Sequence, residues 1–304
     1  MGRSAARPAV AAAALVIGLA SCGGRTAGTP RARLAATGTT AAPSTTAPPS
    51  SRLDVTAFEF QYDPGGPVNL AAGTVTITLR NQGAEPHHAQ LLRLHDGVTD
   101  DDIAAAIADD PSVTPLLALG DEVGGVGMVA PGGSAQVTER LSAGSYLMFC
   151  LVRAPSGETH AMDGMVAEFQ VSPRKAAAEA APRPTVDLRL TDKGFQLPSP
   201  FPRHGLLRVA NQGTRPHEVN FLALPPGRGL PAIEPYLRAL KASSLLQPPP
   251  PLKPAGGVAA LAPGGTAILP VDLKPGRYLA ICLVRGPDGE PHALHGMLQT
   301  FTVR

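Results

Sequence analysis

Apolar and polar residues alternate in several short segments of the chain. Val75, Ile77 and Leu79 are separated by threonines, which gives one apolar and one polar face, as in a half-buried β-strand. Segment 135–141 also alternates, and the Pro-Gly-Gly before it is a turn signal. Segment 146–151 is apolar on both faces, as expected of a central strand in a β-sandwich. The pattern predicts a mostly β chain.

Two helical segments interrupt the strand pattern. Thr99 offers a helix cap, and the three aspartates after it suit the positive end of a helix dipole, so we predict a helix over 103–108 that stops near Pro111. A second helix is predicted over 232–242, with Pro235 in its first turn, where a missing N–H is tolerated. The four successive prolines that follow this segment predict an extended loop.

The chain contains an internal repeat, and this repeat sets the predicted architecture. Residues 52–172 resemble residues 185–304, and a linker rich in Ala, Arg, Pro and Lys, 173–184, separates them. The two copies agree best from Ala130 and Ala262 onward, and each copy ends in a predicted final strand. We therefore predict an all-β fold of two tandem Greek-key β-sandwich domains, each with a short helical insertion.

The amino-terminal segment resembles a bacterial lipoprotein signal. Arg3 and Arg7 precede a short apolar stretch, 9–20, that is too short to span a bilayer stably. Residues 1–22 end in Leu-Ala-Ser-Cys, which resembles a lipobox, and the resemblance implies that Cys22 is lipidated and anchors an extracytoplasmic protein to the bacterial cell membrane. The alternatives are an ordinary signal peptide with a chance cysteine, or an uncleaved helix.

The segment after the signal predicts a disordered tether. Residues 23–51 are rich in Ala, Thr, Pro, Ser and Gly and have almost no large apolar side chains, so they cannot build a core. The tether would hold the two repeats at a distance from the membrane surface.

Residue types that bind copper recur in both copies with the same spacing. Cys150 is followed by a histidine ten residues later and by a methionine five residues after that, and the same spacing follows Cys282. Well before each cysteine lies an Asn-Gln-Gly-x-x-Pro-His piece, which ends at His87 in the first copy and at His217 in the second. Thiolate, two imidazoles and a thioether form the ligand set of a type 1 copper site, because soft ligands select copper.

This pattern resembles the cupredoxin, or blue copper, family over nearly all of the chain after the tether. The resemblance implies one or two copper ions and two ligand sets: His87, Cys150, His160 and Met165 in the first copy, and His217, Cys282, His292 and Met297 in the second. His88 competes with His87, but the repeat partner of His88 is Glu218, which favours His87. The other histidines lack repeat partners and are expected at the surface or around the site: His95, His204 and His295.

The segment from cysteine to histidine is longer than in the family pattern. Nine residues separate Cys150 from His160, and nine separate Cys282 from His292. Each segment contains a turn signal, so we expect a hairpin. The copper prediction depends on this hairpin folding back far enough to bring the histidine beside the thiol. The alternatives are a disulfide between Cys150 and Cys282, or two buried inert thiols.

Composition and motifs argue against several other functions. The chain has 26 Lys and Arg against 24 Asp and Glu and no basic run, so nucleic-acid binding is not expected. Multicopper oxidases use His-x-His pairs, and the sequence has none, so we expect no enzyme activity. We expect a membrane-anchored copper protein for electron transfer or copper handling, with a redox or copper-delivery protein as partner. The alternative is a metal-free tandem binding or structural module of the cell envelope.

Overall fold

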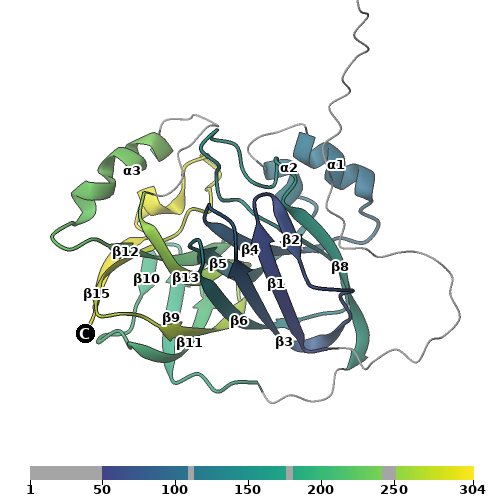
Figure 1. Cartoon of the computed structure of the whole chain (residues 1–304), viewed down its shortest axis with the longest axis horizontal. Helices are drawn as coiled ribbons and strands as arrows, with labels where there is room; N and C mark the ends of the chain where they lie inside the picture. Colours follow the sequence, from purple (N-terminus) through teal and green to yellow (C-terminus); the bar gives the residue numbers. More distant parts are fainter. Residues whose placement is uncertain (1–49, 109–112, 176–180, 242–250) are drawn as a thin grey trace, which may run out of the picture.

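The computed structural model describes residues 50–108, 113–175, 181–241 and 251–304, which form a mainly β structure with helices at one end (Figure 1). The predicted all-β class is confirmed. Cys22 and the part of the tether before Ser50 lie outside the described residues. No helix in the described part of the chain has the length and hydrophobicity needed to cross a membrane.

We call residues 52–172 the first half and residues 185–304 the second half. The strands and helices that begin in the first half are β1 (Arg52–Phe58), β2 (Gln61–Asp63), β3 (Leu70–Asn81), β4 (His87–Leu94), α1 (Asp100–Ala108), α2 (Thr114–Leu117), β5 (Gly120–Val129), β6 (Ser134–Leu141), β7 (Gly144–Phe149) and β8 (Val166–Lys175). Those of the second half are β9 (Val186–Thr191), β10 (Gly194–Gln196), β11 (His204–Asn211), β12 (His217–Leu224), η1 (Leu230–Ile233), α3 (Glu234–Lys241), β13 (Lys253–Leu261), β14 (Thr266–Asp272), β15 (Gly276–Ile281), η2 (His292–His295) and β16 (Leu298–Val303).

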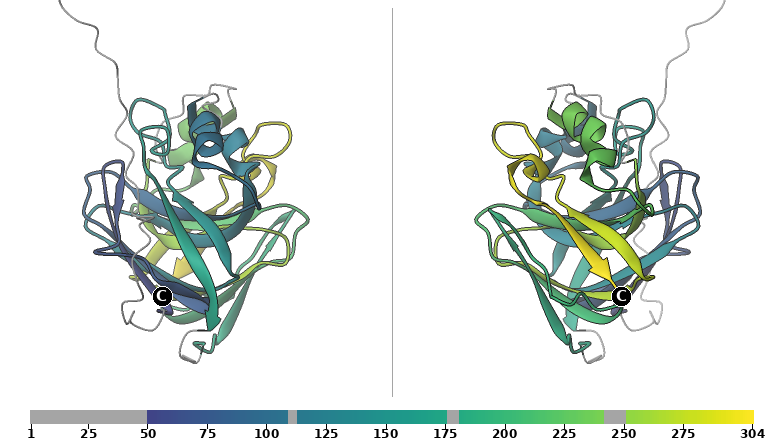
Figure 2. Two further views of the ribbon diagram at one scale, coloured as in Figure 1. Left: turned by 90° about the vertical axis from the view of Figure 1, so that its right-hand side faces the viewer. Right: turned by 90° about the vertical axis from the view of Figure 1, so that its left-hand side faces the viewer.

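Two sheets run through both halves, and the helices lie above them in the side views of Figure 2. Sheet A has the strand order β3-β8-β7-β4-β5-β13-β12-β15-β16, and sheet B has the order β2-β1-β3-β6-β14-β11-β9-β10. The long strand β3 belongs to both, because its first residues pair with β8 and the rest with β6. Two separate sandwich domains therefore stay a prediction.

The junction between the halves has local two-fold symmetry. Strand β5 pairs with β13, and at its centre Val126 pairs with Val258, its own counterpart in the repeat. The Gln90 amide donates to the carbonyl of Ala260 at 3.0 Å and accepts from the N–H of Ala260 at 2.8 Å. On the other side of the axis, the Asn220 side chain accepts from the N–H of Met128 at 2.8 Å. These bonds satisfy polar groups that the junction buries.

The two apolar faces of segment 146–151 pack against different layers, as predicted. Tyr146, Met148 and Cys150 belong to the main core between the sheets. Leu147 and Phe149 belong to a second cluster with side chains of α1 and α2. The helical insertion of the first half therefore covers the outer face of sheet A, which would otherwise expose large apolar side chains to water.

Most predicted elements are confirmed, with shifted bounds. Strands β3, β6 and β7 cover the alternating segments, and α1 begins at Asp100 with reciprocal hydrogen bonds between Thr99 and Asp102. The second helix begins as η1 and continues as α3, with Pro235 in the first turn of α3 as expected. Residues 109–112 and 242–250, which contain Pro111 and the first three of the four prolines of the extended loop, lie outside the described part.

Two boundaries and one helix differ from the sequence prediction. Strand β8 continues to Lys175, so the first three residues assigned to the linker belong to this strand. The strand continues there because it pairs with the first residues of β3. Ser50, assigned to the tether, forms a bridge with Leu70. Helix α2 was not predicted, because its four residues are too few to show a helical period.

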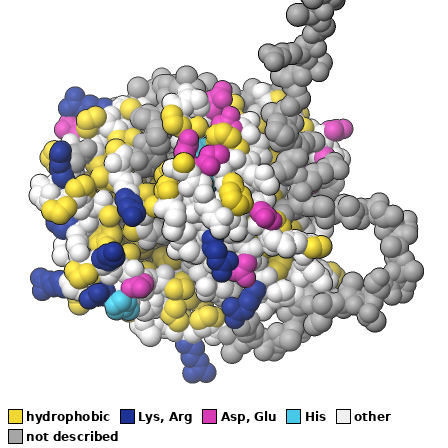
Figure 3. Space-filling view, in the orientation of Figure 1, with side chains coloured by type: hydrophobic (Ala, Val, Ile, Leu, Met, Phe, Trp, Pro, Cys, Tyr) yellow, Lys and Arg dark blue, Asp and Glu magenta, His cyan; other side chains and the backbone are white. Residues whose placement is uncertain are grey.

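The surface carries charges of both signs. On the face shown in Figure 3, basic side chains gather mostly on the left, where strands of the second half lie in Figure 1. Acidic side chains lie mostly toward the top and right of that face. This distribution fits the nearly balanced composition of the chain.

Candidate metal centres

The Asn-Gln-Gly-x-x-Pro-His piece folds the same way in both halves because its asparagine is a hydrogen-bond hub. The Asn81 side chain accepts from the N–H of Gly83 at 2.8 Å and donates to the carbonyls of Glu85 and Val129 at 2.7 and 2.9 Å. This network fixes the loop that ends at His87, the first residue of β4.

In the second half, Asn211 makes the same three bonds, to Gly213 at 2.9 Å and to the carbonyls of Arg215 and Leu261 at 2.7 Å each. His217 thus begins β12 as His87 begins β4. Both histidines are almost completely buried.

The long segment after the cysteine folds back as a hairpin. The carbonyl of Cys150 accepts from the N–H of Ala161 at 2.8 Å, and the N–H of His160 donates to the carbonyl of Val152 at 2.9 Å. Gly157, with φ 93°, forms the tight tip that a side chain would strain. The extra residues therefore lengthen the hairpin without moving His160 away from Cys150.

The second hairpin repeats this ladder. Ala293 donates to the carbonyl of Cys282 at 2.9 Å, and His292 donates to the carbonyl of Val284 at 2.9 Å. Gly289, with φ 78°, lies at the tip. The geometric condition that the sequence left open is met in both halves.

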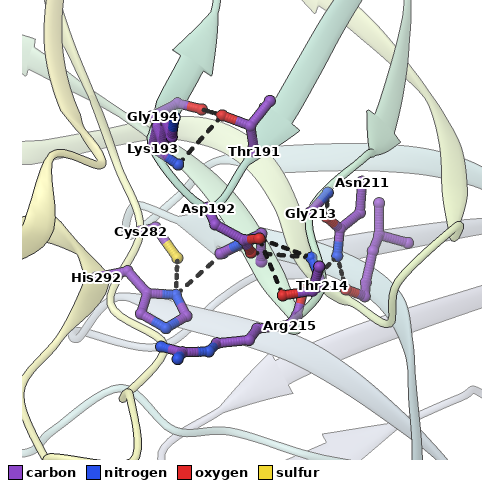
Figure 4. Close-up of polar contacts among 12 residues, drawn as sticks. Thr191, Asp192, Lys193, Gly194, Asn211, Gly213, Thr214, Arg215, Cys282 and His292 are labelled. Carbon is purple, nitrogen blue, oxygen red and sulfur yellow. Dashed lines mark hydrogen bonds and ion pairs between the residues drawn. The ribbon is translucent and has the colours of Figure 1, made fainter.

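The predicted ligand atoms converge. In the first half, Nδ1 of His87 lies 3.0 Å from Nδ1 of His160, which lies 3.5 Å from the sulfur of Cys150. In the second half, the Nδ1 atoms of His217 and His292 are also 3.0 Å apart. The sulfur of Cys282 lies 3.7 Å from Nδ1 of His292 (Figure 4).

All three donor atoms of each half lie within 4.8 Å of one another and could hold a metal ion. Both cysteines are buried and free, so the disulfide alternative is wrong for this structure. No other ligand-bearing group in the described residues is both buried and built from three such side chains.

Backbone hydrogen bonds connect each methionine to the cysteine and the second histidine of its half. Met165 donates its N–H to the carbonyl of His160 at 2.8 Å and accepts from the N–H of Cys150 at 3.2 Å. Met297 does the same with His292 at 3.0 Å and Cys282 at 3.1 Å. Both methionine side chains are buried in the main core, in the cluster that also contains the cysteines.

Burial sets the protonation of the donor atoms. Desolvation lowers the pKa of His87, His160 and His292 to about 4, so these imidazoles are neutral at neutral pH and offer lone pairs. Desolvation raises the pKa of the Cys150 thiol to about 12, and that of Cys282 is raised as well. A cation beside the sulfur would stabilise the thiolate that desolvation disfavours.

A carboxylate lies near Nε2 of the first histidine in each half, and in the second half it is hydrogen-bonded to it. Asp192 lies 2.9 Å from Nε2 of His217, and Glu59 lies 3.6 Å from Nε2 of His87. The hydrogen bond from His217 is the largest of the effects that lower the pKa of Asp192 to about 2. A carboxylate on Nε2 favours the tautomer whose Nδ1 carries the lone pair, as a metal requires.

The residue after the first histidine supports the cysteine loop. The Nε2 atom of His88 accepts from the N–H of Leu151 at 3.0 Å. In the second half, a carboxylate oxygen of Glu218 accepts from the N–H of Leu283 at 2.7 Å. His88 is thus a supporting residue, and the preference for His87 as the ligand candidate agrees with the geometry.

Sequence reasoning missed the residues that surround the donor atoms. Glu59 and Asp192 occupy equivalent positions in the two copies, just after β1 and β9, and comparing the copies there could have found them. The histidines without repeat partners are exposed and lie near carboxylates: His95 near Asp121, His204 near Asp272, and His295 near Asp288 and Glu290.

The donor set fits copper better than a hard cation, because it combines sulfur and imidazole and has no carboxylate among its three converging atoms. The buried position of the donor atoms also suits copper, because the Nδ1 atom of each histidine faces the other histidine of its pair and not water.

No protein-family profile matches the chain, and no curated protein is similar to it. Among solved structures, it is similar to an auracyanin from the photosynthetic bacterium Roseiflexus castenholzii, with 24% identity and a TM-score of 0.29, over 41% of this chain and 99% of that one. It is also similar to auracyanin A, a "blue" copper protein from Chloroflexus aurantiacus, with 17% identity and a TM-score of 0.25, over 40% and 96%.

A multicopper oxidase matches over 83% of this chain and 88% of its own length, with 16% identity and a TM-score of 0.25. These identities and scores are low, so the assignment of the two centres rests on their own geometry.

Proposed function

We propose that the protein binds copper at a type 1-like centre in each half and serves electron transfer or copper handling. The observation that carries this proposal is the convergence, in both halves, of two imidazole nitrogens and one thiol within 4.8 Å of one another. His87, Cys150, His160 and Met165 would hold one ion, and His217, Cys282, His292 and Met297 the other. Copper bound there would take up and release one electron.

The chain contributes a rigid set of donors. The hairpin ladders and asparagine hubs hold the imidazoles in place before any ion arrives, so little rearrangement accompanies binding. The buried surroundings exclude water from the thiols, which limits their oxidation. Such fixed donors suit an ion that changes its charge without changing its ligands.

Location and partners belong to the same proposal. A lipidated Cys22 would anchor the chain outside the cytoplasm, and a redox or copper-delivery protein would be its partner. We propose no enzymatic role, because the sequence has no His-x-His pair of the kind that multicopper oxidases use.

A copper titration of the metal-free full chain tests the function. We expect two equivalents to bind and an intense thiolate-to-copper absorption to develop in the visible. The Cys150→Ser, Cys282→Ser double variant is the matched control and should show no such absorption. Absence of both colour and retained copper in the parent chain would leave the metal-free binding module as the better description.

A separate experiment tests the anchor. Cells that express the parent chain and a Cys22→Ser variant are labelled with a fatty-acid analogue and fractionated. We expect label in the parent chain alone and a parent chain that remains with the membranes. An unlabelled parent chain would contradict the lipid anchor without affecting the copper proposal.

A further inference from the structure

The two candidate centres differ at the residue that precedes the Pro-His pair shared by both halves. In the first half this residue is Glu85, and its carboxylate lies 3.0 Å from Nε2 of His160. In the second half it is Arg215, whose side chain extends beside His292 in Figure 4. A guanidinium cannot accept a hydrogen bond, and Nε2 of His292 is buried with no hydrogen-bond partner among the described residues.

This exchange has an electrostatic consequence for the histidine that lies nearest the thiol. A carboxylate that accepts the Nε2–H makes Nδ1 of His160 a stronger donor to a cation. Arg215 places a positive charge near His292 instead, and this charge, after burial and His217, contributes to the low pKa of His292. Negative charge near a centre favours the more highly charged ion, and positive charge disfavours it.

Other charged neighbours also differ between the two centres. Glu59 and Asp192 lie near the first histidine of each half, but only Asp192 is within hydrogen-bond distance, and Nε2 of His87 has no hydrogen-bond partner among the described residues. Glu218 replaces the neutral His88 and is buried beside the cysteine loop. The negative charge of an ionised Glu218 would offset the positive charge of Arg215. A Glu218→Gln background therefore isolates the effect of exchanging Glu85 for Arg215, and it keeps the hydrogen bond from the N–H of Leu283, which the amide oxygen can still accept.

Building on the proposed function, we propose that Glu85 and Arg215 make the two centres unequal. The first centre favours divalent copper, the second favours monovalent copper, and the second therefore has the higher reduction potential. Outer carboxylate partners change metal affinity by about 10–100-fold. A tenfold change in the ratio of the two copper affinities equals about 59 mV for a one-electron couple.

Redox titration of the copper-loaded full chain tests this inequality. Cys282→Ser leaves the first centre and Cys150→Ser leaves the second, and the visible absorption of each is followed against electrode potential. We expect the second centre to be higher by about 59 mV or more. Glu85→Gln should raise the potential of the first centre, and Arg215→Gln should lower that of the second, also in the Glu218→Gln background. Equal potentials, a reversed order, or potentials that neither substitution moves would overturn the inequality.

A measurement without copper separates this inference from the proposed function. In the metal-free chain, nitrogen NMR of the imidazoles should show His160 protonated at Nε2, with the proton lost from this position when Glu85 is changed to Ala. His292 should respond to Arg215→Gln and not to Glu85→Ala. If the parent chain with copper showed no visible absorption, the proposed function would be wrong. If the protonation of the His160 ring did not change in Glu85→Ala, the inference alone would be wrong.

Discussion

The two halves hold the same donor atoms at nearly the same separations and surround them with different neighbours. The Nδ1 atoms are 3.0 Å apart in both, and the sulfur lies 3.5 Å from Nδ1 in one half and 3.7 Å in the other. Among the neighbours that differ, Glu85, His88 and Tyr62 in the first half correspond to Arg215, Glu218 and Phe195 in the second. The backbone of each half thus fixes which atoms converge, while its side chains set the charge around them.

The largest expected effect is loss of one centre at a time. Cys150→Ser should abolish copper binding in the first half and leave one equivalent bound, and Cys282→Ser should do the same for the second half, because a hydroxyl is a poor ligand for copper. Copper content and visible absorption of the purified variants measure this. If either single variant lost both equivalents of copper, the two centres would not bind copper independently, and the two halves would have to share one site.

Next in size is the cost of removing an asparagine hub, and here the halves should agree. Asn81→Ala and Asn211→Ala each leave one N–H and two carbonyls without their partner, so we expect each to lower the free energy of unfolding by about 3 kcal/mol. Urea unfolding of the metal-free chain measures this. The exposed neighbours provide matched controls, since Gln82→Ala and Gln212→Ala should cost no more than about 0.5 kcal/mol. Unequal losses at the two asparagines would show that the scaffolds differ as well as the charges.

The contrast between scaffold and neighbours also explains what the sequence could predict. The spacing from Cys150 to Met165 is local, and strand, hairpin and following strand turn it directly into a contact. Glu59 and Asp192 come from turns that lie two strands earlier in the chain than the histidines they approach, and no local period marks them. The pairing of β5 with β13 was beyond prediction for another reason. It depends on which strand edges remain open after each half has folded.

Glu139 marks a further difference between the halves, and it predicts a pH dependence. Its carboxyl is buried, accepts from the N–H of Gly125 at 2.8 Å, and corresponds to Val271 in the second half. Burial raises its pKa to about 8, so the folded chain keeps a proton that the unfolded chain releases near its ordinary value of 4.5. Stability from this group is therefore complete below about pH 4.5 and is lost as pH rises toward 8.

We expect Glu139→Gln to remove this loss and to stabilise the chain by about 2 kcal/mol at pH 9, with little effect at pH 4.5. Urea midpoints of the metal-free parent and variant across this range measure the difference. Glu234→Gln is a control, because that carboxyl is exposed and the loss of its ion pair with Arg238 should cost little stability at either end of the pH range. If the urea midpoints of the parent and of Glu139→Gln changed with pH in the same way, the Glu139 carboxyl would be accessible to water and the prediction would be wrong.

The smallest expected effect comes from the hydroxyl that distinguishes Tyr62 from Phe195. Tyr62 donates to the carbonyl of His88 at 2.5 Å, and its hydroxyl also approaches the sulfur of Cys150. Tyr62→Phe should cost about 1 kcal/mol of stability, because the carbonyl loses its partner. It should also shift the visible absorption of the first centre toward that of the second, since hydrogen bonding around the sulfur tunes a copper–thiolate site.

Tyr278→Phe provides the matched change away from both thiols, because the Tyr278 hydroxyl donates to the carbonyl of Lys274 at 2.8 Å. It should alter stability to a similar or smaller extent and leave both absorption bands in place. The comparison uses the Cys282→Ser background for Tyr62 and the Cys150→Ser background for Tyr278, so that each spectrum reports one centre. A band that moves equally in both variants would show that the shift reflects general loosening of the fold, and the difference between the centres would then rest on Glu85, Arg215 and the residue pair at 88 and 218.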